Sequence, residues 1–204
     1  VNANQDSVAY EEALRSFHSS DFEETIIHLK NSLKDDVNHI PSRILLAETL
    51  LELGNGAAAE TELLDLQAEG VDLNRLVTLI AKSLILQNKY DEALEVANVG
   101  YRGRDVESDI LFLRGQSYLG LNQIKLADNA FTDALSISPS HQKAILGKAQ
   151  IAVSKNNLEL AMRHIDKALE FIQQWPNAWI MKSVVAQSTG DDAMALNAIT
   201  RALE

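Results

Sequence analysis

The chain has 204 residues, of which 46% are hydrophobic and only 5% aromatic, and it contains no cysteine. Alanine and leucine dominate and favour helices, whereas strand-forming β-branched and aromatic residues are sparse, so we expect an all-α protein. The net charge of −11 repels phosphate backbones and anionic lipid headgroups, which argues against nucleic acid as a partner, and the lack of cysteine excludes disulfides and thiolate chemistry.

The sequence aligns with itself at a period of 34 residues without a gap. In chain order the six repeats are residues 6–39, 40–73, 74–107, 108–141, 142–175 and 176–204, the last of which is five residues short. Such a period, with small and large residues at fixed places, is typical of a solenoid, in which each repeat buries its apolar face against its neighbours. We therefore expect residues 1–204 to form a single right-handed α-α superhelix of about six helix-turn-helix repeats.

Particular positions of the repeat indicate how each helix pair packs. Small side chains allow two helices to approach closely, and they occupy position 8 (Ala13, Ala47, Ala81, Gly115, Ala149, Ser183), position 20 (Thr25, Ala59, Ala93, Ala127, Ala161, Ala195) and position 27 (Ser32, Leu66, Gly100, Ala134, Ala168, Ala202). Larger side chains predominate at position 24, which holds Leu29, Leu63, Ala97, Phe131, Ile165 and Ile199. Position 15 predicts the turn between the two helices, because Gly and Asn tolerate the left-handed conformation that ends a helix; it holds Ser20, Gly54, Asn88, Asn122, Asn156 and Gly190.

Three features depart from this pattern and predict looser packing where they occur. Arg43 stands at position 4, where most repeats have an apolar residue, and Gly100 stands in the expected second helix of the third repeat. Charged residues occupy position 7 in four repeats, namely Glu12, Arg114, Lys148 and Lys182.

The pattern resembles the tetratricopeptide repeat over almost the whole chain, most clearly in the fourth repeat, with Leu111, Gly115, Tyr118, Ala127, Phe131, Ala134 and Pro139. This resemblance implies a non-catalytic scaffold that binds a peptide or protein in a concave groove, which the first helix of each repeat lines. Positions 5, 9 and 12 then supply the candidate groove residues, namely Tyr10, Leu14, Phe17, Ile44, Glu48, Leu51, Thr78, Lys82, Ile85, Phe112, Gln116, Leu119, Leu146, Gln150 and Ile180.

The groove positions leave more than one interpretation open. An apolar wall with a few amides suits a peptide or helix, but positions 5 and 12 would serve equally to pack adjacent first helices. Repeats of this family that grip a C-terminal carboxylate use Lys and Asn, and only Lys82 and Lys143 occupy such positions, so we expect no carboxylate clamp. Glu48 and Lys82 are expected to pair across neighbouring helices, whereas Trp175 and Trp179 are expected to close the joint between the last two repeats, unless Trp175 is exposed as an interaction anchor.

No catalytic or cofactor motif is evident. The five histidines, His18, His28, His39, His141 and His164, show no metal-binding spacing, and no phosphate-binding loop or nucleophile elbow occurs. We therefore expect no enzyme activity, no metal and no cofactor. Residues 40–73 hold seven acidic residues against Arg43 alone, which indicates a solvated acidic face or, alternatively, a basic partner.

A narrower resemblance concerns the first two repeats. The run Asp21–Leu33, with Pro41, Arg43–Leu46 and Ala59–Leu63, is similar to the N-terminal part of bacterial tetratricopeptide lipoproteins of the PEP-CTERM sorting and exopolysaccharide system. This resemblance implies a periplasmic or outer-membrane-anchored protein, whereas without it the chain is expected in the cytoplasm. The start without Met and the end at Glu204 inside a predicted helix suggest a piece of a longer protein without a membrane span in this part. The alternatives are the recognition arm of an enzyme encoded outside the chain and a self-association module that forms a homo-oligomer.

Overall fold

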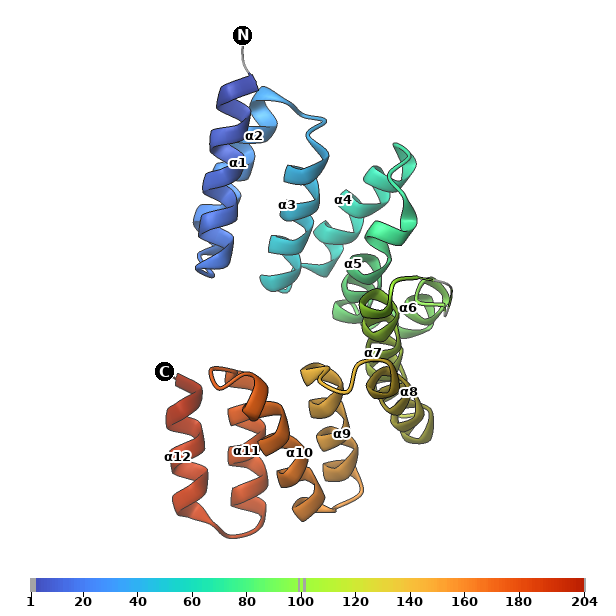
Figure 1. Ribbon diagram of the computed structural model, residues 1–204, viewed down its shortest axis with the longest axis vertical. Helices are drawn as coiled ribbons and strands as arrows, with labels where there is room; N and C mark the ends of the chain where they lie inside the picture. Colours follow the sequence, from blue (N-terminus) through green and yellow to red (C-terminus); the bar gives the residue numbers. More distant parts are fainter. Residues whose placement is uncertain (1–2, 99, 101, 204) are drawn as a thin grey trace. The chain divides into compact units, whose positions relative to one another are not determined.

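The computed structural model describes residues 3–98, 100 and 102–203, and these residues form twelve α-helices (Figure 1). The chain divides into two compact units, residues 1–97 and 98–204, each of which is described by itself. Unit 1 contains α1 (Ala3–His18), α2 (Phe22–Asp35), α3 (Ile40–Glu52), α4 (Gly56–Ala68), α5 (Leu73–Leu86) and α6 (Tyr90–Val96). Unit 2 contains α7 (Arg104–Gly120), α8 (Ile124–Ile137), α9 (Gln142–Ser154), α10 (Leu158–Phe171), α11 (Pro176–Ser188) and α12 (Asp192–Leu203).

Consecutive helices pair as hairpins, α1 with α2 through to α11 with α12, so each unit is a row of three hairpins (Figure 1). Within a unit, the second helix of one hairpin packs against the first helix of the next, as α2 does on α3 and α10 on α11. The first helices also contact one another, for example α3 with α5 and α7 with α9. This arrangement confirms the predicted all-α fold of helix-turn-helix repeats, and it places the first helices side by side along each unit.

The turn inside every hairpin has the same backbone conformation. All six residues at position 15 have positive φ, from 54° at Asn156 to 79° at Gly190. The amide after each of them bonds a carbonyl five residues earlier, as Asp21 N does to Ser16 O at 2.9 Å. Asp21 is the N-cap of α2, and its carboxylate accepts a hydrogen bond from Glu24 N at 3.0 Å. The predicted left-handed turns are thus confirmed, and a helix-capping residue follows where the sequence provides one.

The predicted packing positions form the core of the first five hairpins. At position 24, the side chains Leu29, Leu63, Ala97, Phe131 and Ile165 are all fully buried. The small residues opposite are buried with them, so the helices approach as the repeat pattern predicts. In the sixth hairpin the equivalent residue, Ile199, is 38% exposed, and its neighbours on α12, Leu196 and Leu203, are 69% and 85% exposed. The last hairpin therefore presents an apolar surface that its predecessors bury.

The third hairpin differs from its prediction. Helix α6 has 7 residues and ends at Val96, so Gly100 lies outside the helix that was expected to contain it. The prediction that position 27 is a packing position is therefore wrong for this repeat. Gly and β-branched Val have low helix propensity, and the Gly100 amide instead donates a hydrogen bond to Glu107 Oε1 at 3.2 Å.

Arg43 does not loosen the core, contrary to the expectation from its charge. The residue is only 8% exposed, its guanidinium Nε donates to Glu62, and its Nη1 lies 2.6 Å from Glu69 Oε2. Both carboxylates come from the adjoining second helix and the residue that follows it. A buried charge is tolerated when it is paired and hydrogen-bonded. The methylene groups of Arg43 therefore fill the apolar position, while its guanidinium pairs with Glu62 and Glu69.

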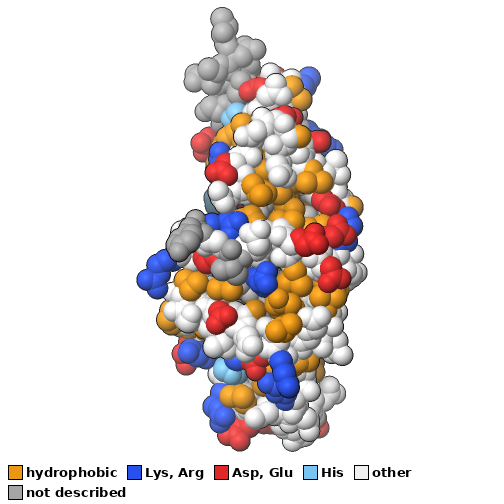
Figure 2. Space-filling model, turned by 90° about the vertical axis from the view of Figure 1, so that its right-hand side faces the viewer, with side chains coloured by type: hydrophobic (Ala, Val, Ile, Leu, Met, Phe, Trp, Pro, Cys, Tyr) orange, Lys and Arg blue, Asp and Glu red, His pale blue; other side chains and the backbone are white. Residues whose placement is uncertain are grey.

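The charged residues at position 7 likewise have partners. Lys182 Nζ lies 2.6 Å from Asp166 Oδ1, Lys148 pairs with Asp128, and His28 Nδ1 lies 3.2 Å from Glu12 Oε2. Arg114 Nη2 donates to the Tyr118 hydroxyl at 2.9 Å, and its guanidinium lies over the same ring. On the face shown in Figure 2, acidic and basic side chains are accordingly interspersed with apolar ones.

None of the helices in the described part of the chain is long and apolar enough to span a bilayer.

Candidate functional site

The first helices of unit 2 enclose a groove of about 530 Å³, here called the unit 2 groove. Helices α7, α9 and α11 supply its walls, together with the residue that precedes α11. The lining residues are Phe112, Gln116, Lys143, Leu146, Gln150, Trp175, Asn177, Ile180, Met181 and Val184. Five of them, Phe112, Gln116, Leu146, Gln150 and Ile180, belong to the groove residues predicted from the repeat.

The apolar part of the unit 2 groove packs against the hydrophobic core of the hairpins. Phe112 is half-buried, and its ring centroid lies 6.0 Å from that of Phe131, which is fully buried in the core. Leu146 is 7% exposed and forms part of the floor. Ile180 and Val184 are 44% and 52% exposed and stand one helical turn apart on α11. Exposed apolar side chains in a concave surface are typical of a site for a partner's apolar groups.

The polar part of the unit 2 groove consists chiefly of amides. Gln116 Nε2 donates to Gln150 Oε1 at 3.4 Å, which links two positions one repeat apart. Because a primary amide has two N–H donors and a carbonyl acceptor, this bond leaves the Gln116 carbonyl and the Gln150 NH₂ available to a ligand backbone. Lys143 and Asn177 are exposed at the groove's edge. The interpretation that only Lys82 and Lys143 occupy clamp-like positions is therefore wrong, since Asn177 holds position 2 of its repeat as Lys143 does.

The two tryptophans have different surroundings. Both pack against the core cluster of Ala149, Ile165 and Val185, as expected for residues that close the joint between the last two hairpins. Trp175 also lines the unit 2 groove, a role that the sequence left open. Trp179 faces elsewhere, with its Nε1 donating to Gln173 O at 2.7 Å.

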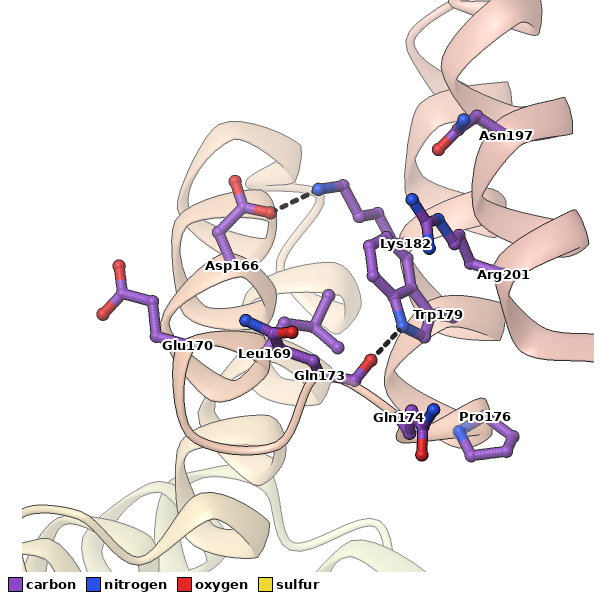
Figure 3. A pocket seen from close by; sticks show the side chains of 10 residues that line it. All are labelled: Asp166, Leu169, Glu170, Gln173, Gln174, Pro176, Trp179, Lys182, Asn197 and Arg201. Carbon is purple, nitrogen blue, oxygen red and sulfur yellow. Dashed lines mark hydrogen bonds and ion pairs between the residues drawn. The ribbon is translucent and has the colours of Figure 1, made fainter. Parts of the chain in front are cut away.

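A second cleft of about 650 Å³ lies between α10, α11 and α12 (Figure 3). In this cleft Asp166 pairs with Lys182, whose Nζ lies 5.2 Å from the centre of the Trp179 ring. Arg201 and Asn197 extend from α12 on the opposite side, as Figure 3 shows. Trp179 occupies position 4 of its repeat, where the smaller Val77 and Ile145 are buried in earlier repeats, and it lines this cleft.

In unit 1 the predicted groove residues have different surroundings. Several mainly pack against the cores between neighbouring hairpins, as the packing interpretation of these positions requires; they are Tyr10, Leu14, Ile44 and Ile85, and Leu119 does the same in unit 2. Thr78 is partly buried on α5. Phe17, Glu48, Leu51 and Lys82 line one cavity of about 190 Å³ together with Glu52 and Leu79, and Phe17 and Leu51 also pack in the cores.

The carboxyl group of Glu48 has an unusual environment in this cavity. Burial raises the pKa of Glu48, and the nearby charge of Glu52 raises it further, while Lys82 lowers it without reversing the shift. The phenol of Tyr10 responds to the same surroundings, since burial, Glu48 and Glu11 all raise its pKa. The charge of Lys82 therefore favours the Glu48 carboxylate, but burial has the larger effect on its pKa, and the direct pairing of these two residues stays a prediction.

No group of three or more His, Asp or Glu side chains in the described part of the chain is arranged to hold a metal ion. In each of the adjacent carboxylate pairs Asp35–Asp36 and Asp191–Asp192, one side chain has a local backbone partner. Asp191 Oδ1 accepts from Met194 N at 2.9 Å at the start of α12, and Asp36 Oδ1 accepts from Asn38 N at 3.0 Å. His141 acts at the start of α9, where its Nδ1 accepts from Ala144 N at 3.1 Å.

Comparison with known proteins supports the fold. Residues 108–141 match the family model for the tetratricopeptide repeat. The DnaJ homolog subfamily C member 7 homolog of Dictyostelium discoideum is 24% identical over 159 residues, which is 78% of this chain and 26% of that protein. The chain thus spans about a quarter of that relative's length.

Solved structures resemble the whole chain at low sequence identity. The type IV pilus biogenesis factor PilW has a TM-score of 0.68 and 15% identity, covering 96% of this chain and 91% of PilW. A thermophilic tetratricopeptide-repeat protein of Thermus thermophilus has a TM-score of 0.69 and 16% identity, with 98% and 100% covered. The APC/C hetero-tetramer Cut9–Hcn1 gives a TM-score of 0.72 at 18% identity, covering 100% of this chain and 39% of that one. The chain therefore has the tetratricopeptide-repeat fold, and residues 108–141 are a tetratricopeptide repeat.

Proposed function

We propose that the chain is a non-catalytic scaffold whose unit 2 groove binds an apolar peptide or helix of a partner protein. The observation that carries this proposal is the combination of exposed Ile180 and Val184 with the Gln116–Gln150 amide pair in one concave surface. Apolar contacts supply affinity, and the free amide groups can pair the ligand backbone. The tetratricopeptide-repeat fold supports the proposal, because an array of hairpins presents an extended surface for binding.

The test is selection of peptides from a displayed library by the purified chain, followed by titration of the selected peptide. Ile180→Glu places a charge in the apolar wall and is expected to abolish binding. Leu126→Glu is the matched control, because Leu126 is 46% exposed on the second helix of a hairpin in the same unit. If no peptide is selected, or if both variants bind equally well, the groove is not the binding site.

We further propose that this scaffold acts in the bacterial cell envelope, in protein sorting or exopolysaccharide export. The resemblance of the first two repeats to envelope lipoproteins supports this place of action, and PilW is itself a pilus biogenesis factor. Fractionation of the source cells tests it with an antibody against the chain. Recovery of the native protein in the cytosolic fraction alone would contradict the proposal.

Self-association is a second candidate, which the apolar surface of α12 favours. Leu196, Ile199 and Leu203 are exposed there, although position 24 is fully buried in every earlier hairpin. Light scattering across a range of concentrations tests this candidate. A dimer that Ile199→Glu converts to a monomer would support it, whereas a monomeric mass at every concentration would exclude it.

A further inference from the structure

The cavity of unit 1 differs in chemistry from the unit 2 groove, although both lie among first helices. We call it the acidic pocket; Phe17, Glu48, Leu51, Glu52, Leu79 and Lys82 line it. Its volume of about 190 Å³ suits one side chain and is much smaller than the unit 2 groove of about 530 Å³. The shape of the pocket therefore indicates a site for a single group of a ligand.

The walls of the acidic pocket suit an aliphatic stem. Leu51 and Leu79 are 8% and 7% exposed, and the half-buried Phe17 adds an aromatic ring from α1. Lys and Arg side chains place their methylene groups on such surfaces while their charged heads stay near polar groups. An aromatic ring beside the head can add a cation–π contact.

The charges of the acidic pocket are unbalanced. Glu48 and Glu52 stand one turn apart on α3, and Lys82 on α5 is the single basic residue in the lining. Two carboxylates and one ammonium leave an excess of one negative charge. Because Glu48 is partly buried and lies near Glu52, its ionisation is costly, and a second cation would lower that cost.

The acidic stretch of residues 40–73 supports the same conclusion by elimination. Glu62 and Glu69 pair with Arg43, while Glu60 accepts from Lys89 Nζ at 2.9 Å. The contacts of Arg43 lie within the second repeat, that of Glu60 joins the second repeat to the third, and together they involve three of the seven acidic residues of this stretch. Glu48 and Glu52 instead line the pocket among the first helices, where a partner has access.

We propose that the acidic pocket receives a basic side chain, lysine or arginine, of a partner peptide that lies along the first helices of unit 1. This site is separate from the unit 2 groove, and it assigns a ligand chemistry that the proposed function does not include. The rival interpretation is that Lys82 alone completes the pocket. If the pocket binds a basic side chain, Lys82 competes with that side chain for the two carboxylates. In the rival interpretation, Lys82 is itself the cation of the pocket and no ligand cation binds.

The test compares two blocked pentapeptides, acetyl-Ala-Leu-Lys-Leu-Ala-amide and the same peptide with norleucine in place of lysine. Amide chemical shifts of the ¹⁵N-labelled chain are followed by NMR during titration with each peptide. The lysine peptide is expected to bind about fivefold more tightly, as a partly exposed ion pair allows, and to shift the amides of Glu48, Leu51 and Leu79. Equal affinity for the two peptides would overturn the proposal.

Variants locate the preference. Glu48→Gln and Glu52→Gln should each reduce it, while Asp65→Asn, a change at an exposed carboxylate on α4, should retain it. Lys82→Met removes the competing cation and should increase the preference, a result that a purely structural role for Lys82 would not produce. If Glu48→Gln, Glu52→Gln and Lys82→Met all leave the lysine preference unchanged, the site is refuted. Ile180→Glu must leave the lysine preference intact, so failure of the unit 2 groove and failure of the acidic pocket are distinguishable.

Discussion

Phe131 is packed directly against the backbone of Gly147, so closely that a Cβ on Gly147 would lie 2.6 Å from the Phe131 ring. Gly115 on α7 approaches the same ring, and a Cβ there would lie even closer to it. Phe131 is fully buried, so its ring is surrounded by other core side chains. The hairpins α7–α8 and α9–α10 thus meet around one aromatic ring. Any side chain at Gly115 or Gly147 would overlap with this ring.

This contact predicts that Gly147→Ala lowers the free energy of unfolding by about 2 kcal/mol through overpacking. Helix propensity alone would give the opposite sign, because alanine favours a helix more than glycine does. Urea denaturation of the purified chain measures the effect. In a Phe131→Leu background the same substitution should cost much less, and an equal cost in both backgrounds would show that the ring is not responsible.

A second prediction concerns Ser20, whose φ is 61° at the turn position where other repeats have Gly or Asn. Ser20→Gly should stabilise the chain by about 0.5 kcal/mol, because glycine adopts this conformation without steric cost. Thermal denaturation provides the measurement. Asn122→Gly is the control at the equivalent turn and should have a smaller effect, since asparagine already tolerates positive φ. A decrease in melting temperature for Ser20→Gly would contradict the prediction.

The ion pairs of Asp128 predict a dependence of stability on pH. Burial raises the pKa of this carboxyl, but hydrogen bonds from Lys148 and Lys155 outweigh burial and hold the pKa below its ordinary value. A lowered carboxyl pKa stabilises the fold above the unfolded value near 3.8, and this contribution is lost as pH falls further. Lys148→Met should therefore reduce stability at pH 7, by less than about 1 kcal/mol because the pair is partly exposed. Denaturation at acid pH should show the difference shrinking, and a constant difference would argue against the pair.

Glu48 predicts the opposite pH dependence. Its raised pKa means that the native state holds the proton more tightly than the unfolded chain, so stability falls as pH rises through the raised pKa. Glu48→Gln removes the cost of ionisation and should increase stability at pH 7. Below pH of about 4.5, where the carboxyl is protonated in both states, the variant and the parent should be nearly equal. A destabilised variant at neutral pH would show that the carboxylate has a better partner than its burial implies.

Much of the fold follows from the repeat, because packing positions recur with it. The burial of Leu29, Leu63 and Phe131 and the left-handed turn at Asn122 could be predicted from local pattern alone. The early end of α6 at Val96 could not be predicted, because the 34-residue period assigns a position to every residue whether or not the last helical turn forms. The partners of Arg43 also required the structure, because Glu62 and Glu69 are brought near it only by the hairpin.

The candidate sites were predicted less completely. Position in the repeat placed Phe112 and Gln150 in the unit 2 groove, but Trp175 precedes its helix and lies outside the chosen positions. Asn177 had a signal in the sequence, since it shares its position with Lys143. The acidic pocket of Glu48 depends on burial and on Leu79, and neither is evident from charge pattern alone.

The hairpins share one internal turn, whereas the connectors between them vary. Residues 36–39, 69–72, 138–141 and 172–175 join four pairs of hairpins, and residues 97–103 join the remaining pair. Gly70 has a φ of 94° in one connector, while Ser138 and Ile172 begin theirs in extended conformations. A hairpin with a constant turn and a replaceable connector behaves as a module. Duplication or deletion of 34 residues would therefore lengthen or shorten the array without disturbing any helix pair, a simple route by which the number of binding positions can evolve.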